Sequence, residues 1–360
     1  MHPLEAIPSS PKPAELRSRV LTRSDKAAWN DIIRSLPEEH RFLADDWTAL
    51  LEEAYGYSSH LLTLEEKGRI VAALPLSVIR SVFTGKRAVS LPFFDRSLIH
   101  SPDQDLITPL FQELVKVGRE QNLDYVEVRG GVERIKGSSP SLAFYNHIVD
   151  LSQGSDAVFS NFASSTRRAI RKAQKTGVAV DISTSRIALR GYYDLHCETR
   201  RRHGLPPQPY SFFELLHKRL IETGKGVIVS ATFESKLAAS AIYLQQGNTI
   251  HYKYGASDET LQQSRCNNLV MWTALEHYSQ QGFLKMDFGR NSLKNQEGLR
   301  KYKLNYGASE QVIHYLRYNL KTNKAVAMSD DVFGWHNKLF ANLPISLNRL
   351  AGKFLYRHIA

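Results

Sequence analysis

The sequence predicts an α+β protein made of two tandem copies of one architecture, each a mixed central sheet flanked by helices. In each half, helical patterns come first, and a strand, a hairpin, a helix and a strand follow. The chain has 360 residues, which suffices for two ordinary domains, and its 42% hydrophobic and 23% charged residues are typical of globular proteins. Residue identity between the halves is too low to mark a repeat by inspection.

The first unit is expected over residues 19–150, after a disordered, proline-rich tail over residues 1–18. Helical spacing in "KAAWNDIIRSLPEEH" and "DDWTALLEEAYG" predicts two helices. The stretch that follows alternates as three strands, with turns at Lys67-Gly68 and at Gly85. "LITPLFQELVKVGREQNL" then predicts an apolar-striped helix, and "DYVEVRG" predicts a strand.

The second unit is expected over residues 151–320. A basic helix comes first, then the strand "VAVDIS" and helices near "RIALRGYYDLHCETRRRH" and "YSFFELLHKRLIETG". A hairpin ending in "HYKYGAS", the helix "NNLVMWTALEHYSQQG" and the strand "LKMDFG" follow. The last segment, residues 321–360, mixes aromatic and basic residues, which fits either a packed helical tail or an amphipathic helix at a membrane surface.

Charge and cysteine content restrict the class of protein. The 47 Lys and Arg against 36 Asp and Glu give a net charge of +11, which favours a partner rich in phosphate, a nucleic acid or a membrane surface. Two cysteines without a CxxC pair, and no histidine cluster at ligand spacing, indicate neither a disulfide framework nor a metal site. No signal peptide or spanning segment is apparent, so a cytoplasmic monomer is expected.

The basic helix lies within "NFASSTRRAIRKAQKTG", residues 161–177. At 100° per residue its cations share a broad face, opposite Ala169, Ile170 and Ala173. They are Arg167, Arg168, Arg171, Lys172 and Lys175. Either Asn161 or the run 164–166 is expected to cap the start, and Gly177 the end. Because a face of a single charge repels itself, an anion-binding role is favoured over a solvated surface.

The densest group of polar residues is "MDFGRNSLKNQEGLRKYKLNYGAS", residues 286–309. A buried strand ends at Asp287, and a loop carrying Arg290 is expected to lead into a second strand. Strand alternation would place Lys301 and Lys303 on one face and Tyr302 on the other, although a solvated loop fits the pattern equally well. The sequence contains neither the GxSxG motif of serine hydrolases nor the GxxxxGK[ST] motif of P-loop proteins. Cys266 is expected to pack at the start of a helix rather than to act as a nucleophile.

The order of these segments resembles the FemAB-like branch of the GNAT-fold acyltransferases. That branch includes the aminoacyltransferases of peptidoglycan interpeptide bridges and relatives encoded with exopolysaccharide export systems. The resemblance covers roughly residues 20–320 and includes "LPF" at 91–93, "YVEVRG" at 125–130 and "DFGR" at 287–290. It implies two tandem GNAT-like domains.

The resemblance also implies roles for single residues. The family's Phe-Lys-x-x-Phe/Trp-Gly element corresponds here to Tyr302–Gly307, which makes Lys303 the expected catalytic cation. Its Asp-Phe-Gly-Arg element matches Asp287–Arg290, and Asp287, the second expected catalytic residue, would be structural or would orient the amine. The element Tyr252–Gly255 resembles a position that lines the acceptor groove. Further residues are expected to bind substrate: Arg202, Tyr210, Tyr254, Arg290 and Tyr306, together with Arg167, Arg168, Arg171 and Lys172 of the basic helix.

The function implied is acyl or aminoacyl transfer to an amine of a cell-envelope precursor, of peptidoglycan or exopolysaccharide, that carries phosphate or sugar. No bound cofactor is expected, and the donor is left open among aminoacyl-tRNA, an acyl-carrier protein and acyl-CoA. Acyl-CoA is disfavoured, because "QQSRCNNLVMW" offers no glycine where a pyrophosphate would meet backbone amides. The absence of long heptad helices weakens the case for tRNA. The alternative is a non-catalytic GNAT-fold binding protein of a polysaccharide export system at the inner face of the membrane.

Overall fold

The computed structural model describes residues 16–97, 99–330 and 335–359, so most of the predicted N-terminal tail lies outside the described residues. The tail was expected to extend to residue 18, but a strand already begins at Arg17. The first half contains β1 (Arg17–Thr22), α1 (Lys26–Ser35), α2 (Glu38–Arg41), α3 (Thr48–Tyr55), β2 (Ser58–Glu66), β3 (Arg69–Ser81), β4 (Gly85–Val89), α4 (Ile107–Glu120), β5 (Tyr125–Arg129) and β6 (Leu142–Asp150). The turns predicted at Lys67-Gly68 and Gly85 are present, and all three residues have positive φ.

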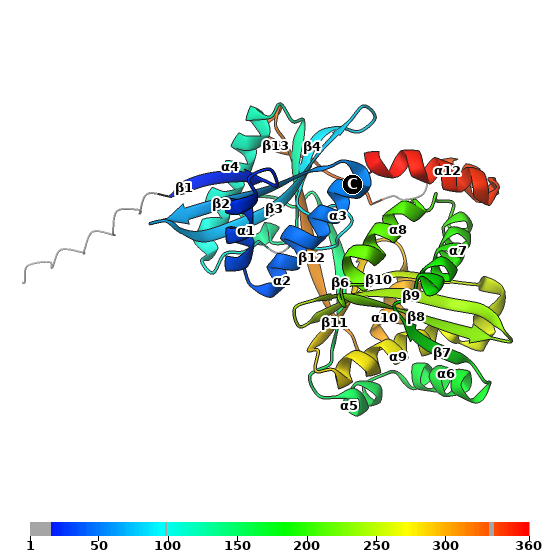
Figure 1. Ribbon diagram of the computed structural model, residues 1–360. Coiled ribbons are helices and arrows are strands. Elements are labelled where there is room, and N and C mark those ends of the chain that lie inside the picture. The colour runs from blue at the N-terminus through cyan, green and yellow to red at the C-terminus, as the bar shows by residue number, and fades with distance from the viewer. Residues whose placement is uncertain (1–15, 98, 331–334, 360) are drawn as a thin grey trace, which may run out of the picture.

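The second half follows the same plan. It contains α5 (Ser155–Ser160), α6 (Ser164–Lys175), β7 (Ala179–Ser183), α7 (Arg186–Arg202), α8 (Tyr210–Leu216), β8 (Gly226–Phe233), β9 (Lys236–Gln246), β10 (Thr249–Ser257), α9 (Cys266–Gln280), β11 (Lys285–Ser292), α10 (Glu297–Leu304), β12 (Ser309–Asn319) and β13 (Lys324–Ala325). In the first half, β2, β3 and β4 pair antiparallel, and α4 then connects β4 to its parallel neighbour β5. In the second half, β8, β9 and β10 pair antiparallel, and α9 connects β10 to its parallel neighbour β11. The predicted tandem repeat of one α+β architecture is confirmed (Figure 1).

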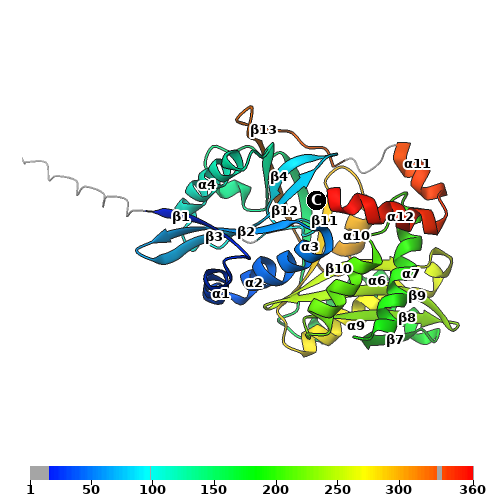
Figure 2. The ribbon, with the colours of Figure 1, turned by 45° about the horizontal axis from the view of Figure 1, so that its top comes forward.

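One sheet runs through both halves, in the order β1-β2-β3-β4-β5-β12-β6-β11-β10-β9-β8-β7, with β13 beside β12. Strand β12 comes late in the chain but lies between β5 and β6, and it pairs antiparallel with both. Its return to the first half fixes where the preceding helix, α10, can lie. Figure 2 shows the helices of each half packed around this continuous sheet.

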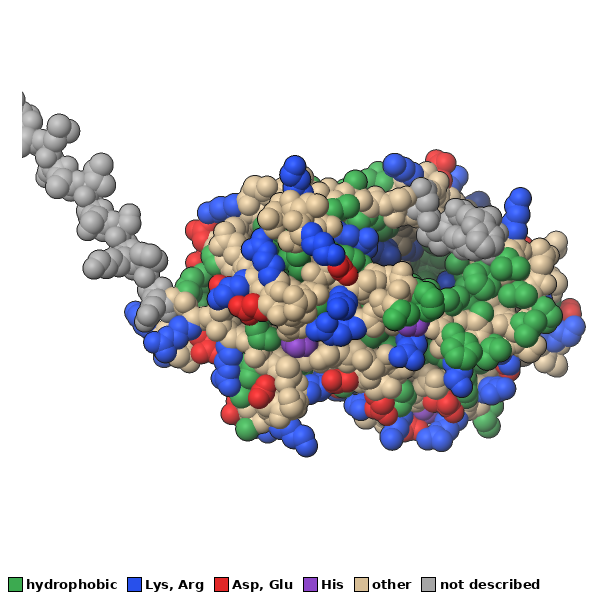
Figure 3. Space-filling model, turned by 90° about the horizontal axis from the view of Figure 1, so that it is seen from above, with side chains coloured by type: hydrophobic (Ala, Val, Ile, Leu, Met, Phe, Trp, Pro, Cys, Tyr) green, Lys and Arg blue, Asp and Glu red, His purple; other side chains and the backbone are tan. Residues whose placement is uncertain are grey.

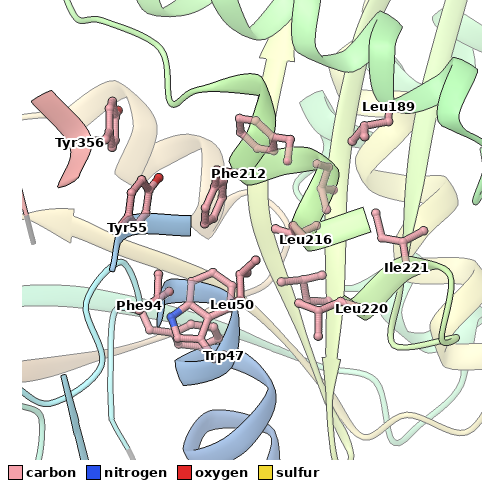
Figure 4. Close-up of a cluster of buried hydrophobic side chains, with 14 of the residues drawn as sticks. Trp47, Leu50, Tyr55, Phe94, Leu189, Phe212, Leu216, Leu220, Ile221 and Tyr356 are labelled. Carbon is pink, nitrogen blue, oxygen red and sulfur yellow. The ribbon is translucent and has the colours of Figure 1, made fainter. Parts of the chain in front are cut away.

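The two halves share a hydrophobic core. One buried cluster contains Trp47 and Leu50 of the first half together with Phe212 and Leu216 of α8 (Figure 4). The rings of Tyr55 and Phe212 stack with centroids 5.5 Å apart and planes 13° from parallel. Because each half contributes large side chains to this cluster, hydrophobic packing holds the two halves together.

The C-terminal segment folds back onto the second half. It forms α11 (Trp335–Asn342) and α12 (Ile345–Leu355), which pack against α7. Tyr356 joins the shared core, and a Cβ on Gly352 would lie 1.9 Å from the carbonyl oxygen of Pro207, so α12 approaches this backbone closely. Among the described helices, none is long and apolar enough to cross a bilayer. One face of the predicted tail is therefore packed on the domain.

A buried charge cluster joins β12 to the first half. The Glu127 side chain is 1% exposed, and its two carboxylate oxygens accept from Arg129, at 2.9 Å, and from Arg317 of β12, at 2.8 Å. The pKa of Glu127 is lowered, because these two guanidinium groups outweigh the effect of burial. Both ion pairs depend on the same carboxylate.

Glu127→Gln should destabilise the protein by about 3–5 kcal/mol, because it removes the charge opposite a buried guanidinium while keeping the side chain's shape. Urea denaturation followed by circular dichroism measures this change. The matched control is Asp105→Asn, which breaks an exposed pair with Lys136 and should leave the midpoint unchanged. Equal midpoints for Glu127→Gln and the wild type would contradict the prediction.

Candidate active site

The parallel strands β10 and β11 separate part-way along their length. They pair only where Thr249, Ile250 and His251 face Lys285, Met286 and Asp287. Beyond that point β10 stays on β9, with a bulge between Tyr252 and Tyr254, and β11 stays on β6. The backbone edges that face each other across this gap are free of strand pairing, and such edges can bind an extended ligand.

Lys303 lies at this gap, but on a helix. The sequence pattern predicted a strand here with Lys301 and Lys303 on the same face, and this prediction is wrong. In α10, Lys301 is exposed, whereas Lys303 is 4% exposed. Its Nζ donates to the carbonyl oxygens of Gly289 (2.8 Å) and Arg290 (3.1 Å), on the strand that has just parted from β10.

Helix α10 is anchored at both ends. Near its start, Arg300 donates to both carboxylate oxygens of Glu310 on β12, at 2.6 and 2.7 Å. The same carboxylate lies 2.9 Å from Nε2 of buried His147 on β6. At its end, the Asn305 carbonyl accepts from Ala163 N at the start of α6, 2.9 Å away. These contacts hold the Lys303 side chain in place.

Asp287 is the last residue of β11 that pairs with β10. Its Oδ1 accepts from Gly289 N at 2.7 Å, and its Oδ2 lies 3.4 Å from Asn146 Nδ2 and 3.8 Å from His251 Nδ1. Burial raises its pKa above the ordinary value, although the Gly289 amide partly offsets this. Burial also lowers the pKa of His251 to about 3, so this histidine is neutral at neutral pH.

The first half contributes Asp95, from the loop after β4. This loop is strained, since Leu91 and Phe93 both have positive φ, at 57° and 59°. The Asp95 carboxylate accepts from Arg290 N at 3.2 Å and lies 3.4 Å from Arg290 Nε. Gly289 (φ +73°) permits this contact, because a Cβ there would lie 2.7 Å from Asp95 Oδ2.

Lys253 reaches the same loop from the bulge in β10. Its ammonium donates to the Phe93 carbonyl and lies over the ring of Phe94, 4.3 Å from the centroid. Bulges of this kind redirect side chains near functional sites. Burial lowers the pKa of Lys253 to about 8, even though the charge of Asp95 acts in the opposite direction.

The charges of this cluster are mutually dependent. Burial lowers the pKa of Lys303 to about 8, and the negative charges of Asp95 and Asp287 partly offset the change. Burial would raise the pKa of Asp95, but the positive charges of Lys253 and Arg290 outweigh it and leave that pKa below the ordinary value. The site thus holds an ionised carboxylate beside ammonium groups that titrate close to neutral pH.

A cavity of about 260 Å³ opens between the halves at this cluster. Its walls include Phe94 and Asp95 from the first half, and Lys253, Asp287 and Gly289 from the second. Such a cavity has polar groups converging from two units, which is the usual arrangement of a ligand site.

The basic helix α6 lines a separate groove. Arg168 and Lys172 face Arg265 and Asn268 at the start of α9, across a space of about 400 Å³. Arg167 and Arg171 point elsewhere: Arg167 donates to the Ser160 carbonyl, and Arg171 lies over the Phe159 ring. The predicted one-sided charge is present, but only part of it faces the groove.

Of the two predictions for the ends of α6, the one for its end is confirmed and the one for its start is wrong. Gly177 has φ +82°, as expected of a residue that ends a helix in the left-handed region. At the start, Ala163 occupies the cap position and no side chain caps the helix, so the predicted cap by Asn161 or by residues 164–166 is wrong. The Ala163 N–H itself donates to the Asn305 carbonyl, which ties the start of α6 to the end of α10.

A third cavity, of about 380 Å³, lies on the side of Tyr302 and Tyr252. Tyr302 lines both the basic groove and this cavity, while Tyr252 lines this cavity and the inter-half cavity. Each of these two tyrosines is therefore a wall that two neighbouring spaces have in common.

The remaining predicted residues lie in different places. Arg202 lines the third cavity and donates to the Ser257 carbonyl at 3.2 Å. Tyr210 packs against Tyr193 and lines none of these three cavities. Tyr254 packs against Phe213 at the edge of the shared core. Tyr306 is fully buried and accepts from Asn268 Nδ2 at 3.0 Å, so it joins α10 to α9.

Several residues of the site were not singled out from the sequence. Asp95 follows "LPFF", a hydrophobic run in the loop after β4, and this polar residue after a hydrophobic run was the available signal. Arg265 has φ +62° and lines the groove, but its neighbours gave no warning of this conformation. In the part of the chain that the structure describes, no group of three or more His, Cys, Asp or Glu side chains is placed to hold a metal ion.

The comparisons with known proteins agree with this architecture. Residues 160–304 match the family described as "Acetyltransferase (GNAT) domain". FemX has a similar structure, with a TM-score of 0.64 at 14% identity over 82% of this chain and 96% of its own. A tandem GNAT protein from the clavulanic acid biosynthesis pathway gives 0.53 at 11% identity, over 85% and 99% of the two chains. No curated protein matches the chain in sequence.

A third similar structure is L-PGS from Bacillus licheniformis, with a TM-score of 0.51 at 13% identity over 86% of this chain and 96% of its own. The fold is therefore that of tandem GNAT proteins, as predicted, and the resemblance to FemAB-like proteins is confirmed at the level of the fold. The domain match over residues 160–304 makes the chain an acyltransferase by class.

The double substitution Arg168→Gln and Lys172→Gln should weaken binding of inorganic tripolyphosphate and flatten its salt dependence, because both cations face the groove. Isothermal titration at several salt concentrations measures both effects. The matched control is Arg167→Gln with Arg171→Gln, which removes the same charge from side chains that point elsewhere. If the two double variants lose affinity equally, the groove is not the anion site.

Proposed function

We propose that the chain transfers an acyl or aminoacyl group from a phosphate-bearing donor to an amine of a cell-envelope precursor, with Lys303 stabilising the negative charge that develops on the donor's carbonyl oxygen. The observation that carries this proposal is the buried Lys303 ammonium at the point where β10 and β11 separate. Two of its three N–H donors are used by the carbonyls of Gly289 and Arg290. The proposal assigns the third to an oxygen of the substrate.

The reaction needs no covalent intermediate with the protein. The neutral acceptor amine attacks the ester or thioester carbonyl and forms a tetrahedral oxyanion, which Lys303 stabilises. The intermediate then expels the donor's oxygen or sulfur, and the proton lost by the amine goes to that leaving group or to water. Positioning and charge stabilisation of this kind can each supply several kcal/mol of the barrier.

The roles of the other groups follow from their positions. The groove of α6 and α9 would bind the donor's phosphate through Arg168, Lys172 and Arg265. The inter-half cavity would bind the acceptor, with Asp287 orienting the amine through the carboxylate that lines the wall. Asp95 and Arg290, which pair across the two halves, would position the acceptor's polar groups.

The cell-envelope part of the proposal is supported by the likeness to FemX and to L-PGS, whose fold this chain shares. The same likeness favours aminoacyl-tRNA over an acyl-carrier protein or acyl-CoA as the donor to test first. The proposal includes a cytoplasmic reaction, which fits two cysteines that are both free and buried.

Lys303→Met should lower kcat and kcat/KM together, by about 10²-fold or more, because the charge that it removes acts on the transition state. Steady-state kinetics on the identified substrates measures this. If Lys303 only binds a substrate phosphate, KM rises instead and kcat is kept. The control is Lys301→Met, since Lys301 is exposed and should cost little. Full activity of Lys303→Met at wild-type stability would disprove the assignment.

The pH profile provides a second measure of the same residue. The pKa of Lys303 is about 8, so kcat/KM should fall as pH rises above that value and the ammonium loses its proton. This descending limb should persist in Lys253→Met and disappear in Lys303→Met. A limb that disappears in Lys253→Met instead would assign the essential charge to Lys253.

A donor screen tests the function itself. Labelled aminoacyl-tRNA, acyl-carrier protein and acyl-CoA are each offered with phosphate-bearing peptidoglycan and exopolysaccharide precursors, and transfer of the label is measured. The proposal expects transfer from at least one donor. Binding of a polysaccharide or lipid precursor without transfer from any donor would favour a non-catalytic binding protein of an export system.

A further inference from the structure

Exposed hydrophobic side chains gather on the face formed by α12 and the β3–β4 hairpin. At the hairpin tip, Val82 is 89% and Phe83 is 76% exposed, and on α12 Phe354 is 62% exposed. Leu347, Leu350 and Ile359 are each about half exposed. Figure 3 shows hydrophobic side chains gathered on the right of the molecule, the side on which Figure 1 places α12. We call these six residues the apolar face.

The helical spacing explains why α12 leaves this face open. Asn348, Gly352 and Tyr356 follow one another at four-residue intervals and are buried against the second half. Leu347, Leu350 and Phe354 are spaced by three and four residues, so they share another side of the helix. Packing thus uses one face of α12 and exposes a second, which is also apolar.

The hairpin tip is fixed to the C-terminal end of the chain. Thr84 Oγ1 donates to the His358 carbonyl at 2.7 Å, and Arg87 donates to the same oxygen at 2.8 Å. Ser81 Oγ lies 3.0 Å from His358 Nδ1, and the rings of Phe83 and His358 meet edge to face with centroids 4.9 Å apart. Two segments far apart in the sequence, the hairpin tip and the residues after α12, are therefore held side by side.

The segments that carry this surface hold cations and no acids. The sequence has no Asp or Glu between residue 332 and its last residue, 360, and none between residues 67 and 94, which include the hairpin. The exposed cations of these segments are Arg80, Lys86, Lys338, Lys353 and Arg357. Carboxylates of other elements lie beside them, since Asp124 accepts from Lys86 N at 2.8 Å. Arg349 is left out of this set because it pairs with Asp194 at 2.7 Å.

We propose that the apolar face is a docking surface for an anionic lipid bilayer. Large exposed apolar side chains suit the acyl region of a bilayer, and the exposed cations of the same segments suit its acidic headgroups. A protein partner would have to supply a matching acidic rim, and a second copy of this chain would bring the same cations against each other. The proposal does not depend on the reaction assigned to the chain.

Sedimentation of the full-length protein with vesicles tests the proposal. The protein should bind vesicles made of equal amounts of phosphatidylcholine and phosphatidylglycerol more tightly than vesicles of phosphatidylcholine alone. Phe83→Ser with Phe354→Ser should weaken binding to the mixed vesicles by at least about tenfold, because two large apolar side chains no longer enter the bilayer. Lys353→Gln with Arg357→Gln should reduce the preference for the anionic vesicles.

The matched control is Ile187→Ser on α7, since Ile187 is 86% exposed and does not belong to the apolar face. It should bind vesicles like the wild type, and thermal unfolding should confirm that every variant is folded. Equal vesicle binding by the wild type and the Phe83/Phe354 variant would overturn the proposal, as would a wild type that binds neither vesicle. A wild type that is dimeric in analytical ultracentrifugation, becomes monomeric in this variant and binds no vesicles would assign the face to a second copy.

Discussion

The pairing of β12 with β5 and β6 is the interaction on which the placement of the candidate site depends. This pairing merges two similar units into one sheet, and it determines where α10 lies, because only a short turn separates α10 from β12. Arg300 and Glu310 then connect the helix to the strand directly. Lys303 reaches the gap between β10 and β11 because the strand that follows it is held in the other half of the molecule.

The site combines groups that burial alone would destabilise. A buried ammonium or carboxylate is costly unless opposite charges and hydrogen bonds compensate for it. Here Asp95 from one half lies among Lys253, Arg290 and Lys303 from the other, so assembly of the halves adds to the compensation that Asp287 gives within its own half. The shared core around Trp47 and Phe212 supplies the rigidity that this arrangement requires.

Much of the fold could be predicted from the sequence, because the strands of both halves alternate or run as long apolar segments bounded by turns. Residues 297–304 could not be assigned in the same way. "LRKYKLNY" alternates polar and apolar side chains over a short window, yet Leu299, Tyr302, Lys303 and Tyr306 also fall at helical spacing, and no capping residue marked the start. Contact with β12 and α6 decides between the two patterns, and such contacts between distant segments are not visible locally.

The candidate site could be predicted only in part, because contacts between distant segments also bring its residues together. Lys303 was reached through the family resemblance, whereas strand alternation gave it the wrong neighbour. Asp95 lies nearly two hundred residues before Arg290 in the sequence, and only the folded chain brings the two together. The division of α6, with Arg168 and Lys172 toward the groove and Arg171 over Phe159, depends on how α5 and α9 pack against the helix.

The late insertion of β12 also has a consequence for how the chain is made. Strands β5 and β6 are complete by residue 150, but the strand that separates them begins only at Ser309. Until the ribosome has released that segment, the facing edges of β5 and β6 have no partner between them. Unpaired edges are where nascent chains associate wrongly. The order of synthesis thus makes the completion of the sheet a late event, because the strand at its centre is made after both of the strands that it joins.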